Sequence, residues 1–148
     1  MENSFKIDAL RGAIETLQLK YETISIATID ELVALYAMDA SFKDPFNRVV
    51  GRDEIKKIFI KMFEQVDSPR FIVRQALQKD HSACLLWEFH FQFKRWDTTK
   101  KCVTGVSWLQ FNEDCLVSSH TDYWDPAEGI YEHLPLIGSL MKGLKKLA

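Results

Sequence analysis

The chain has 148 residues, of which 47% are hydrophobic and 27% charged, and its formal net charge is -2. A chain of this length and composition fits one globular domain, because it can bury most of the surface that its unfolded form exposes. The small negative charge, without a Lys/Arg cluster outside the last turn, argues against nucleic acid as a partner.

The N-terminal sequence MENSFKIDALRGAIETL lacks the apolar region and the cleavage site of a signal peptide, and no apolar run has the length of a membrane span. We therefore expect a cytoplasmic protein. Three cysteines without CxxC spacing fit a reducing compartment, where we expect them to be small core residues rather than disulfide partners or metal ligands. They are Cys84, Cys102 and Cys115.

Three amphipathic helices are predicted in the first half of the chain. Apolar residues recur at steps of three and four over residues 5–24 and again over residues 28–36, where Thr28 and Glu31 fit a capping box. The third helix is predicted over residues 51–66, with apolar residues on one face and lysines on the other.

A short strand is predicted between the second and third helices. The run SFKD at residues 41–44 alternates apolar and polar side chains, whereas Asp39 fits a helix end or a turn. Pro45 pushes Asp44 out of the α region, so we expect its carboxylate on extended backbone at the end of a strand. Such a position is suited to a reactive group.

Beyond Pro69 the pattern changes from helices to strands. Four segments rich in β-branched and aromatic residues are separated by breaks short enough for hairpins, and they cover residues 70–77, 82–96, 100–111 and 115–124. In the second segment the odd-numbered residues from Leu85 to Phe93 are apolar, so one face should pack on helices and the other should meet solvent or a partner. Helices followed by an antiparallel meander predict an α+β fold.

The C-terminal tail, residues 127–148, has an apolar stripe at helical spacing. The stripe consists of Ile130, Leu134, Ile137, Met141 and Leu144. Pro135 should kink or divide this helix. We expect the tail to form a lid on the sheet or on the open end of a cavity, although three lysines near its end leave a weak association with a membrane surface open. Without a linker or an internal repeat, residues 1–148 are expected to form a single domain.

The segment IDELVALYAMDASFKDPFNRVVGRDEIKKIF and the later HTDYWDP resemble the nuclear transport factor 2-like superfamily, in particular its SnoaL-like and ketosteroid-isomerase-like branches. The similar features are a helix ending in ALYA.DA, a strand ending in DP, a glycine, and a helix beginning I..IF. The resemblance implies a cone in which a strongly curved sheet wraps around the helices. It also implies a blind apolar pocket at one end and a convex sheet face that commonly forms a dimer.

The resemblance further implies roles for single residues. Asp44 matches the proton-shuttling aspartate of ketosteroid isomerases. At the rim of an apolar pocket, loss of solvent would raise the pKa of this carboxylate and so make it a better base. The alternative is a surface aspartate that closes the turn KDPFN. The oxyanion hole of the isomerases matches only in part, because its acid falls on Ser107. Its tyrosine falls on Lys20 or Tyr21, of which only Tyr21 lies on the apolar stripe.

The last strand offers a second set of polar residues. His120, Asp122 and Trp124 share one face by two-residue alternation, while Asp125 should cap the turn into the tail. If the first face lines the cone, His120 and Asp122 supply a base and its orienting carboxylate, with Trp124 as an apolar wall. SnoaL-like cyclases resemble this in carrying their acid-base residue on the final strand. The alternative is a satisfied polar pair at a strand edge or in a dimer interface.

The sequence therefore predicts an acid-base enzyme of isomerase, cyclase or hydratase type that acts on a small apolar carbonyl or epoxide compound. The predicted catalytic residues are Asp44, His120 and Asp122, and the predicted ligand-binding residues are Tyr21, Ser107, Trp124 and Phe59. No metal and no cofactor are expected, because the histidines lack i, i+4 pairing and no glycine-rich phosphate loop is present. The alternatives are a ligand-binding protein without catalysis and a dimeric interaction module; Trp108, on the outer face, favours a homodimer.

Overall fold

The computed structural model describes residues 2–95, 97–131 and 137–147, and the side chains of residues 6–95, 97–131 and 142–147. Six helical segments occur in these ranges. The first half of the chain contains α1 (Glu2–Glu22), the 3-10 helix η1 (Ile26–Thr28), α2 (Ile29–Val33) and α3 (Arg52–Gln65). The tail contains α4 (Pro126–Gly129) and α5 (Ile137–Leu147).

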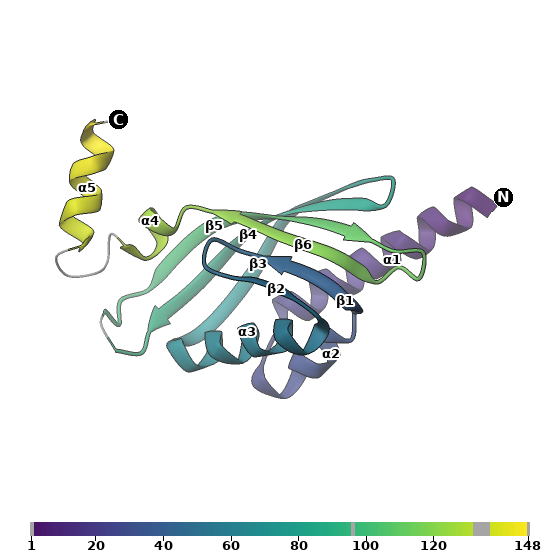
Figure 1. Cartoon of the computed structure of the whole chain (residues 1–148), viewed down its shortest axis with the longest axis horizontal. Coiled ribbons are helices and arrows are strands. Elements are labelled where there is room, and N and C mark those ends of the chain that lie inside the picture. The colour runs from purple at the N-terminus through teal and green to yellow at the C-terminus, as the bar shows by residue number, and fades with distance from the viewer. Residues whose placement is uncertain (1, 96, 132–136, 148) are drawn as a thin grey trace.

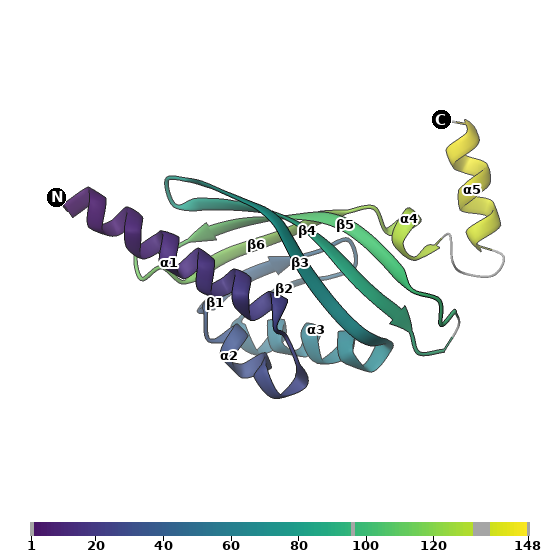
Figure 2. The same ribbon diagram turned by 180° about the vertical axis from the view of Figure 1, so that it is seen from behind.

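Six strands form one sheet in the described part of the chain. They are β1 (Tyr36–Lys43), β2 (Arg48–Val50), β3 (Val66–Lys79), β4 (Ser82–Phe93), β5 (Lys101–Phe111) and β6 (Val117–Trp124). Their spatial order is β2-β1-β6-β5-β4-β3. The sheet curves around α1, α2 and α3, which lie on one side of it (Figures 1 and 2). This arrangement confirms the predicted α+β cone.

The expected antiparallel meander is confirmed for β3 to β6. In addition, β1 pairs with β6 in parallel and forms a hairpin with β2, and neither pairing was predicted from the sequence. β3 begins at Val66 rather than at residue 70, and Pro69 lies where its register shifts between Asp67 and Arg70. The proline is tolerated there because β3 is an edge strand.

The second predicted helix, residues 28–36, is wrong in its second half. α2 ends at Val33, and Tyr36 begins β1, so Asp39 lies in a strand rather than at a helix end or turn. The strand is hard to recognise in the sequence because its register against β6 shifts between Tyr36 and Ser41. That irregularity interrupts the alternation of buried and exposed side chains.

The predicted capping box at Thr28 and Glu31 is also wrong. Thr28 Oγ1 accepts a hydrogen bond from the backbone N–H of Ser25 at 2.9 Å, and the carboxylate of Glu31 forms an ion pair with Lys20 on α1. The physical reason is the 3-10 turn η1, which precedes α2 and places the helix-starting position at Ser25.

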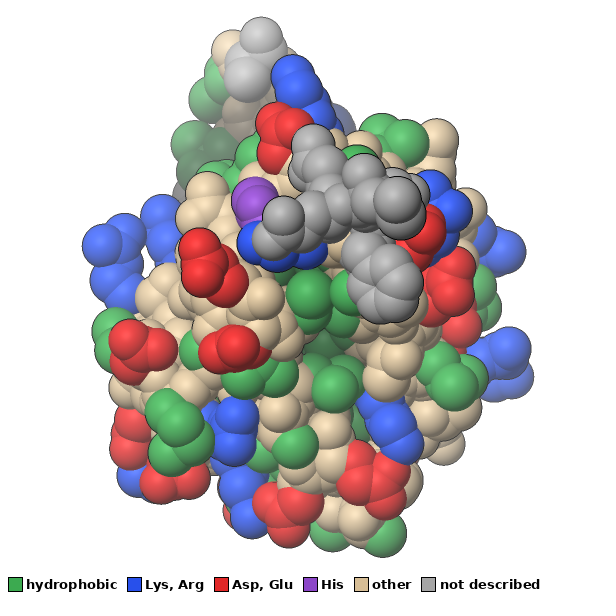
Figure 3. Space-filling model, turned by 90° about the vertical axis from the view of Figure 1, so that its right-hand side faces the viewer, with side chains coloured by type: hydrophobic (Ala, Val, Ile, Leu, Met, Phe, Trp, Pro, Cys, Tyr) green, Lys and Arg blue, Asp and Glu red, His purple; other side chains and the backbone are tan. Residues whose placement is uncertain are grey.

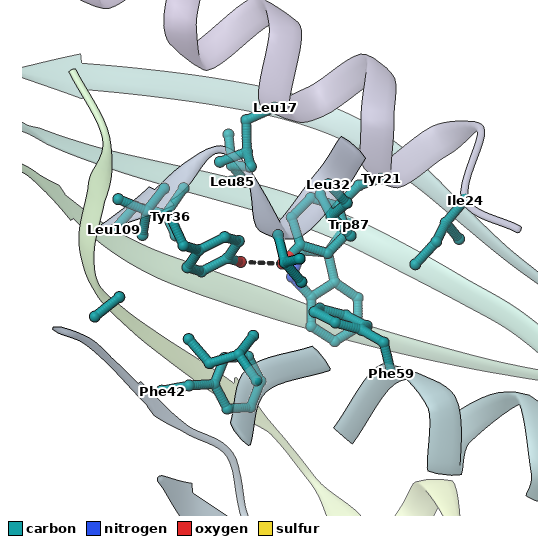
Figure 4. Close-up of a cluster of buried hydrophobic side chains, with 14 of the residues drawn as sticks. Leu17, Tyr21, Ile24, Leu32, Tyr36, Phe42, Phe59, Leu85, Trp87 and Leu109 are labelled. Carbon is teal, nitrogen blue, oxygen red and sulfur yellow. Dashed lines mark hydrogen bonds between the residues drawn. The ribbon is translucent and has the colours of Figure 1, made fainter. Parts of the chain in front are cut away.

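The hydrophobic core lies between the helices and the concave face of the sheet, where Leu17 and Tyr21 of α1 face Leu85 and Trp87 of β4 (Figure 4). The predicted apolar face of β4 is confirmed. Its buried members include Leu85, Trp87, Phe91 and Phe93, while Phe89 is partly buried against them. On the opposite face of the sheet, Trp108 of β5 is 47% exposed.

Within its described part, the start of the tail packs on the sheet as predicted, with Gly129 against Val103, whereas α5 does not (Figures 1 and 2). Asp125 caps α4 as predicted, since its Oδ1 accepts the backbone N–H of Ala127 at 2.9 Å. α5 stands apart from the cone in both views, and Leu144 is 50% exposed (Figures 1 and 2). Gly129 packs closely on β5, so that a Cβ at this position would lie 2.7 Å from Val103. The next residue, Ile130, packs against the core.

The rest of the predicted apolar stripe cannot be followed through the tail, because Leu134 and Pro135 lie outside the described residues. None of the helices in the described ranges has both the length and the apolar character that a bilayer-spanning segment needs.

Candidate active site

A cavity of about 760 Å³ lies between α3 and the concave face of the sheet. Its walls are largely aromatic and include Phe42, Phe59, Phe71, Trp87, Phe91 and Trp124. Four charged residues of the lining, among them Lys94 and Arg95, are exposed and therefore belong to the mouth. Asp44 and Asp122 are the two charged residues of the described lining that are half-buried.

A second hollow of about 740 Å³ lies between α1 and the β3–β4 hairpin and has a different character. Its lining mixes apolar side chains such as Leu10 and Leu77 with charged ones such as Arg11 and Asp80. At this end of the molecule, acidic and basic side chains alternate with hydrophobic ones over the surface (Figure 3). The aromatic cavity is therefore the better site for a small apolar ligand.

Asp122 and His120 form a hydrogen-bonded pair at the inner end of that cavity. Both side chains point to the concave face because they occupy alternate positions of β6. His120 is 2% exposed, and its Nε2 lies 2.6 Å from Asp122 Oδ1. The prediction that His120 and Asp122 share one face is thus confirmed, with the imidazole buried behind a carboxylate that lines the cavity.

Two buried tyrosines contact the other ring nitrogen of His120. The hydroxyl of Tyr36 lies 2.7 Å from His120 Nδ1 and is also hydrogen-bonded to the hydroxyl of Tyr21 (Figure 4). Burial raises the pKa of Tyr36 well above its ordinary value, and the nearby carboxylate of Asp122 adds to the rise, whereas the Tyr21 hydrogen bond lowers it. Burial likewise raises the pKa of Tyr21, followed by the charge effects of Tyr36 and Asp122.

The carboxylate of Asp122, which can only accept, determines the direction of the hydrogen bonds. Both tyrosines keep their protons at neutral pH, so Tyr36 can donate to His120 Nδ1 while it accepts from Tyr21. A neutral imidazole whose Nδ1 accepts carries its proton on Nε2 and donates it to Asp122. Asp122 and the two tyrosines therefore select one tautomer of His120, and that tautomer holds the carboxylate of Asp122.

Asp122 Oδ1 receives a second hydrogen bond from the hydroxyl of Ser107, which is opposite it on β5. Ser107 Oγ in turn accepts the indole N–H of Trp87 at 2.8 Å. Gly105 makes this possible, because a Cβ at that position would lie 2.3 Å from the ring of Trp87. Trp87 can therefore lie against β5 and direct its N–H to Ser107.

The resulting chain of donors uses one oxygen of Asp122 and leaves the other for a ligand. Oδ1 accepts from both His120 and Ser107, whereas no residue in the described ranges donates to Oδ2. A carboxylate that is held on one side and open to an apolar cavity on the other is placed to accept a proton from a bound molecule.

Asp44 also lines the cavity, but both of its oxygens are occupied in the turn that follows β1. Its Oδ1 accepts the backbone N–H groups of Phe46 at 2.7 Å and Asn47 at 2.6 Å, and its Oδ2 accepts Asn47 Nδ2 at 2.9 Å. This is the turn-closing arrangement that the sequence left as the alternative. The turn places the ring of Phe46 5.6 Å from that of Trp124 at the rim of the cavity.

The other predicted ligand-binding residues fall into two groups. Phe59 and Trp124 line the cavity, whereas Tyr21 and Ser107 are buried behind the lining, where they support His120 and Asp122. Tyr36 and Trp87 were not predicted as site residues.

The missed residues could have been found only in part from the sequence. Trp87 was predicted on the inner face of its strand, which is the position from which it reaches Ser107. Tyr36 was assigned to a helix, and its strand lacks a regular alternation that would have revealed it. Its side chain meets His120 only because β1 and β6 pair in parallel.

The described side chains include one group that could hold a metal ion, and it does not line the cavity. It consists of Glu88, His90 and Cys102 on the outer face of the sheet. The expectation that the cysteines are small core residues is therefore wrong for Cys102, which is exposed, while Cys84 and Cys115 are half-buried. Cys102 is exposed because it occupies an outward position of β5.

Comparisons with solved structures confirm the fold. A hypothetical protein with a ketosteroid isomerase-like fold from Catenulispora acidiphila, in complex with trimethylamine, superposes with a TM-score of 0.72 at 14% identity, covering 83% of this chain and 93% of that one. A SnoaL-like polyketide cyclase candidate from Shewanella denitrificans gives a TM-score of 0.68 at 14% identity, covering 81% and 93% of the two chains.

No curated protein sequence matches the chain. The family of SnoaL-like domains, by contrast, matches residues 20–120, from the end of α1 to His120 on β6. This match spans more than half of the chain, and it includes most of the residues that form the cavity. The chain therefore belongs to the SnoaL-like domain family.

Proposed function

We propose that the protein is a cofactor-independent acid-base enzyme that acts on a small apolar carbonyl compound, with Asp122 as its general base. The observation that supports this most is the arrangement of the Asp122 carboxylate. Its Oδ1 is held by His120 and Ser107, and its Oδ2 is left without a partner among the described residues beside an aromatic cavity.

In the proposed reaction, Asp122 Oδ2 removes a proton from the carbon next to the carbonyl group of the bound compound. The electron pair of that C–H bond moves into the carbonyl group and gives an enolate. If the compound has a carbon–carbon double bond next to that carbon, Asp122 returns the proton to the far carbon of the double bond, the double bond shifts toward the re-formed carbonyl group, and the compound is isomerised. Alternatively, the enolate carbon attacks a second carbonyl group and closes a ring, and the alkoxide that forms takes the proton back from Asp122. Neither course needs an oxidant, a metal or a cofactor.

His120 acts as a positioning residue in this proposal. Its Nε2–H stays on the Oδ1 side of Asp122 and fixes the orientation of the carboxylate, while Tyr36 fixes the tautomer of His120. The side chain of His120 is buried and does not line the cavity, so it does not contact the ligand directly. Asp122 is therefore the residue that transfers the proton.

The developing enolate needs a hydrogen-bond donor, and Trp124 is the best placed. Its side chain lines the cavity two residues after Asp122 on the same face of β6, and its indole N–H donates to no described residue. A donor that meets the oxyanion in a water-poor site stabilises the transition state more than it would in water. Ser107, which the resemblance placed at the acid of the isomerases, is already committed to Asp122.

The size and walls of the cavity favour flat, apolar ligands. A volume of about 760 Å³ lies within the range of pockets for small molecules, and most of its lining residues are apolar, with aromatic rings the largest group among them. The polyketide cyclase candidate among the structural neighbours has the same fold.

A thermal-shift screen tests the proposal. The probes are a cyclic ketone such as β-tetralone, an anthraquinone-type polyketide and a terpenoid epoxide, each added to the full chain. A ligand at a hundred times its Kd should add about 2.7 kcal/mol to the free energy of unfolding. Every stabilising probe is then incubated with the protein and analysed for products by mass spectrometry.

The outcomes separate the proposed enzyme from its alternative. Conversion of a stabilising probe by the wild type, but not by Asp122→Asn, is the expected result. Stabilisation without conversion by any probe would favour a protein that binds its ligand without chemistry. If Phe59→Asp, which places a charge in the cavity wall, leaves the stabilisation unchanged, the ligand does not bind in this cavity.

A further inference from the structure

Three potential metal ligands converge on the outer face of the sheet. Glu88 and His90 are two residues apart on β4, so their side chains leave the same face of the strand. Cys102 of β5 is directly opposite His90 in the antiparallel ladder. One ligand atom from each residue lies within 4.8 Å of the other two.

The distances between these atoms fit a tetrahedral metal ion. His90 Nε2 lies 3.7 Å from Cys102 Sγ, and bonds of about 2.1 Å to nitrogen and 2.3 Å to sulfur at tetrahedral angles would separate the two atoms by about 3.6 Å. His90 Nε2 lies 2.9 Å from Glu88 Oε2, and a bound ion would widen this separation to about 3.4 Å.

Arg74 prepares the carboxylate of Glu88 for this role. Its Nε donates to Glu88 Oε1 at 3.0 Å, and its Nη2 donates to Oε2 at 2.9 Å. The hydrogen bonds from Arg74, and next from His90, lower the pKa of Glu88 to about 2, so the carboxylate is ionised at neutral pH. The bond to Oε1 can persist while Oε2 exchanges its contacts with His90 and Arg74 Nη2 for a metal ion.

We propose that Glu88, His90 and Cys102 form a binding site for a transition-metal ion of the zinc type. One oxygen, one imidazole nitrogen and one thiol sulfur are the mixed ligands that Zn²⁺ accepts, whereas Mg²⁺ and Ca²⁺ avoid sulfur. Three protein ligands leave a fourth tetrahedral position open to water or to another ligand. The site lies on the opposite side of the sheet from the aromatic cavity and does not depend on the function proposed for Asp122.

The structure also indicates what metal binding displaces. The hydrogen on His90 Nε2 that now faces Glu88 must leave, and a neutral imidazole can carry it on Nδ1 instead. A metal ion binds the thiolate of Cys102 rather than the thiol. Binding should therefore release about one proton, from Cys102, for each ion bound.

The test is a titration of the full, thiol-reduced chain with Co²⁺, which substitutes for Zn²⁺ and has visible spectra. We expect saturation at one ion per chain, a thiolate-to-cobalt charge-transfer band, and loss of the band on addition of Zn²⁺. Calorimetry of Zn²⁺ binding in two buffers of different ionisation enthalpy should give the released proton.

Matched variants decide whether these three residues form the site. Cys102→Ser should abolish the charge-transfer band, and His90→Gln should weaken binding at least tenfold. Cys84→Ser, which removes a half-buried thiol from the same strand as His90, should leave the band unchanged. The absence of saturable binding by the wild type, or a band that persists in Cys102→Ser, would overturn the proposal; circular dichroism confirms that each variant is folded.

Discussion

His120 Nε2 lies 2.6 Å from Asp122 Oδ1, and the two residues occupy alternate positions of one strand. The two side chains therefore lie close together because residues i and i+2 of β6 project from the same face of the strand. Because β6 is paired on both sides, with β1 and β5, its backbone is held firmly. The neighbours that form hydrogen bonds with the pair, Tyr36 and Ser107, come from these two adjacent strands.

The first prediction concerns Tyr36. Tyr36→Phe removes the 2.7 Å hydrogen bond to His120 Nδ1 and leaves the buried Tyr21 hydroxyl with its longer contact of 3.4 Å to the same nitrogen. We expect a loss of about 1–3 kcal/mol in the free energy of unfolding, because buried polar groups lose their hydrogen bonds. Tyr21→Phe is the matched control and should be less damaging, since Tyr36 keeps its bond to His120. Urea unfolding measures both, and equal losses would contradict the direction of the hydrogen bonds.

The second prediction is a loss of stability at alkaline pH. Tyr21 and Tyr36 have raised pKa values in the folded state, whereas in the unfolded state they ionise near the ordinary value of 10.0. Above about pH 10 the unfolded chain therefore binds fewer protons than the folded one, and the free energy of unfolding falls as pH rises. Each tyrosine should contribute a slope of up to about 1.4 kcal/mol per pH unit.

Tyr36→Phe isolates this effect from the titration of lysines and exposed tyrosines. Its unfolding free energy should run parallel to that of the wild type between pH 7 and pH 9, and it should fall less steeply above pH 10, because one of the two buried hydroxyls is gone. Curves that stay parallel up to pH 11 would show that Tyr36 ionises normally in the folded protein.

The third prediction concerns the position of Trp87. In Gly105→Ala the new Cβ would lie 2.3 Å from the indole ring, so Trp87 must move and its bond to Ser107 must break. We expect a loss of about 1–3 kcal/mol in stability from overpacking, with a change in tryptophan fluorescence. Gly12→Ala is the control, because its Cβ meets nothing within 4 Å on α1; there the helix should gain up to about 1 kcal/mol. A Gly105→Ala variant as stable as the wild type would contradict the packing described.

The fourth prediction is a homodimer through the outer face of the sheet. Trp108 is 47% exposed there, Tyr123 on the neighbouring strand is 61% exposed, and large exposed groups gathered on a sheet face mark an interaction surface. Trp108→Glu should give monomers in light scattering, whereas Tyr123→Glu tests whether the contact extends to β6. Trp108 is six residues from Cys102 on β5, roughly 20 Å along the strand, so the variant should leave metal binding intact. A wild type that is monomeric at micromolar concentration would refute the dimer.

Much of the fold could be predicted from local patterns. The odd-numbered apolar residues of β4 have a period of two, and the apolar face of α3 has a helical period, so each element could be recognised by itself. β1 could not, because its register shift removes the period on which recognition depends. The run that ends in Tyr36 also continues the apolar spacing of α2, and only tertiary pairing decides that it leaves the helix.

The candidate site could likewise be predicted only in part from local sequence patterns. The alternation of His120 and Asp122 on one face follows from the sequence, but their partners Tyr36 and Ser107 come from neighbouring strands. The outer metal cluster was missed for a similar reason. Spacing i, i+4 marks ligand pairs on helices, whereas Glu88 and His90 are two residues apart on a strand and Cys102 lies opposite His90 on the neighbouring strand.

Asp44 illustrates a choice that local sequence leaves open. The run KDPFN is compatible with a reactive carboxylate and with a turn-closing one. The structure shows that its oxygens accept hydrogen bonds from Phe46 and Asn47. Because Asp44 also lines the cavity, its substitution is the appropriate control for the substitution of Asp122.

The most direct test of the central claim compares these two carboxylates by deuterium exchange. The ketone that gives the largest thermal shift is incubated in D₂O with the wild type, Asp122→Asn or Asp44→Asn, and deuterium incorporation next to the carbonyl group is followed by mass spectrometry. The account predicts that Asp122→Asn lowers the exchange rate by a factor of about 10²–10⁴, as expected for loss of a general base, while Asp44→Asn changes it less than tenfold. Exchange that survives in Asp122→Asn and is lost in Asp44→Asn would contradict the account and assign the proton transfer to the turn after β1.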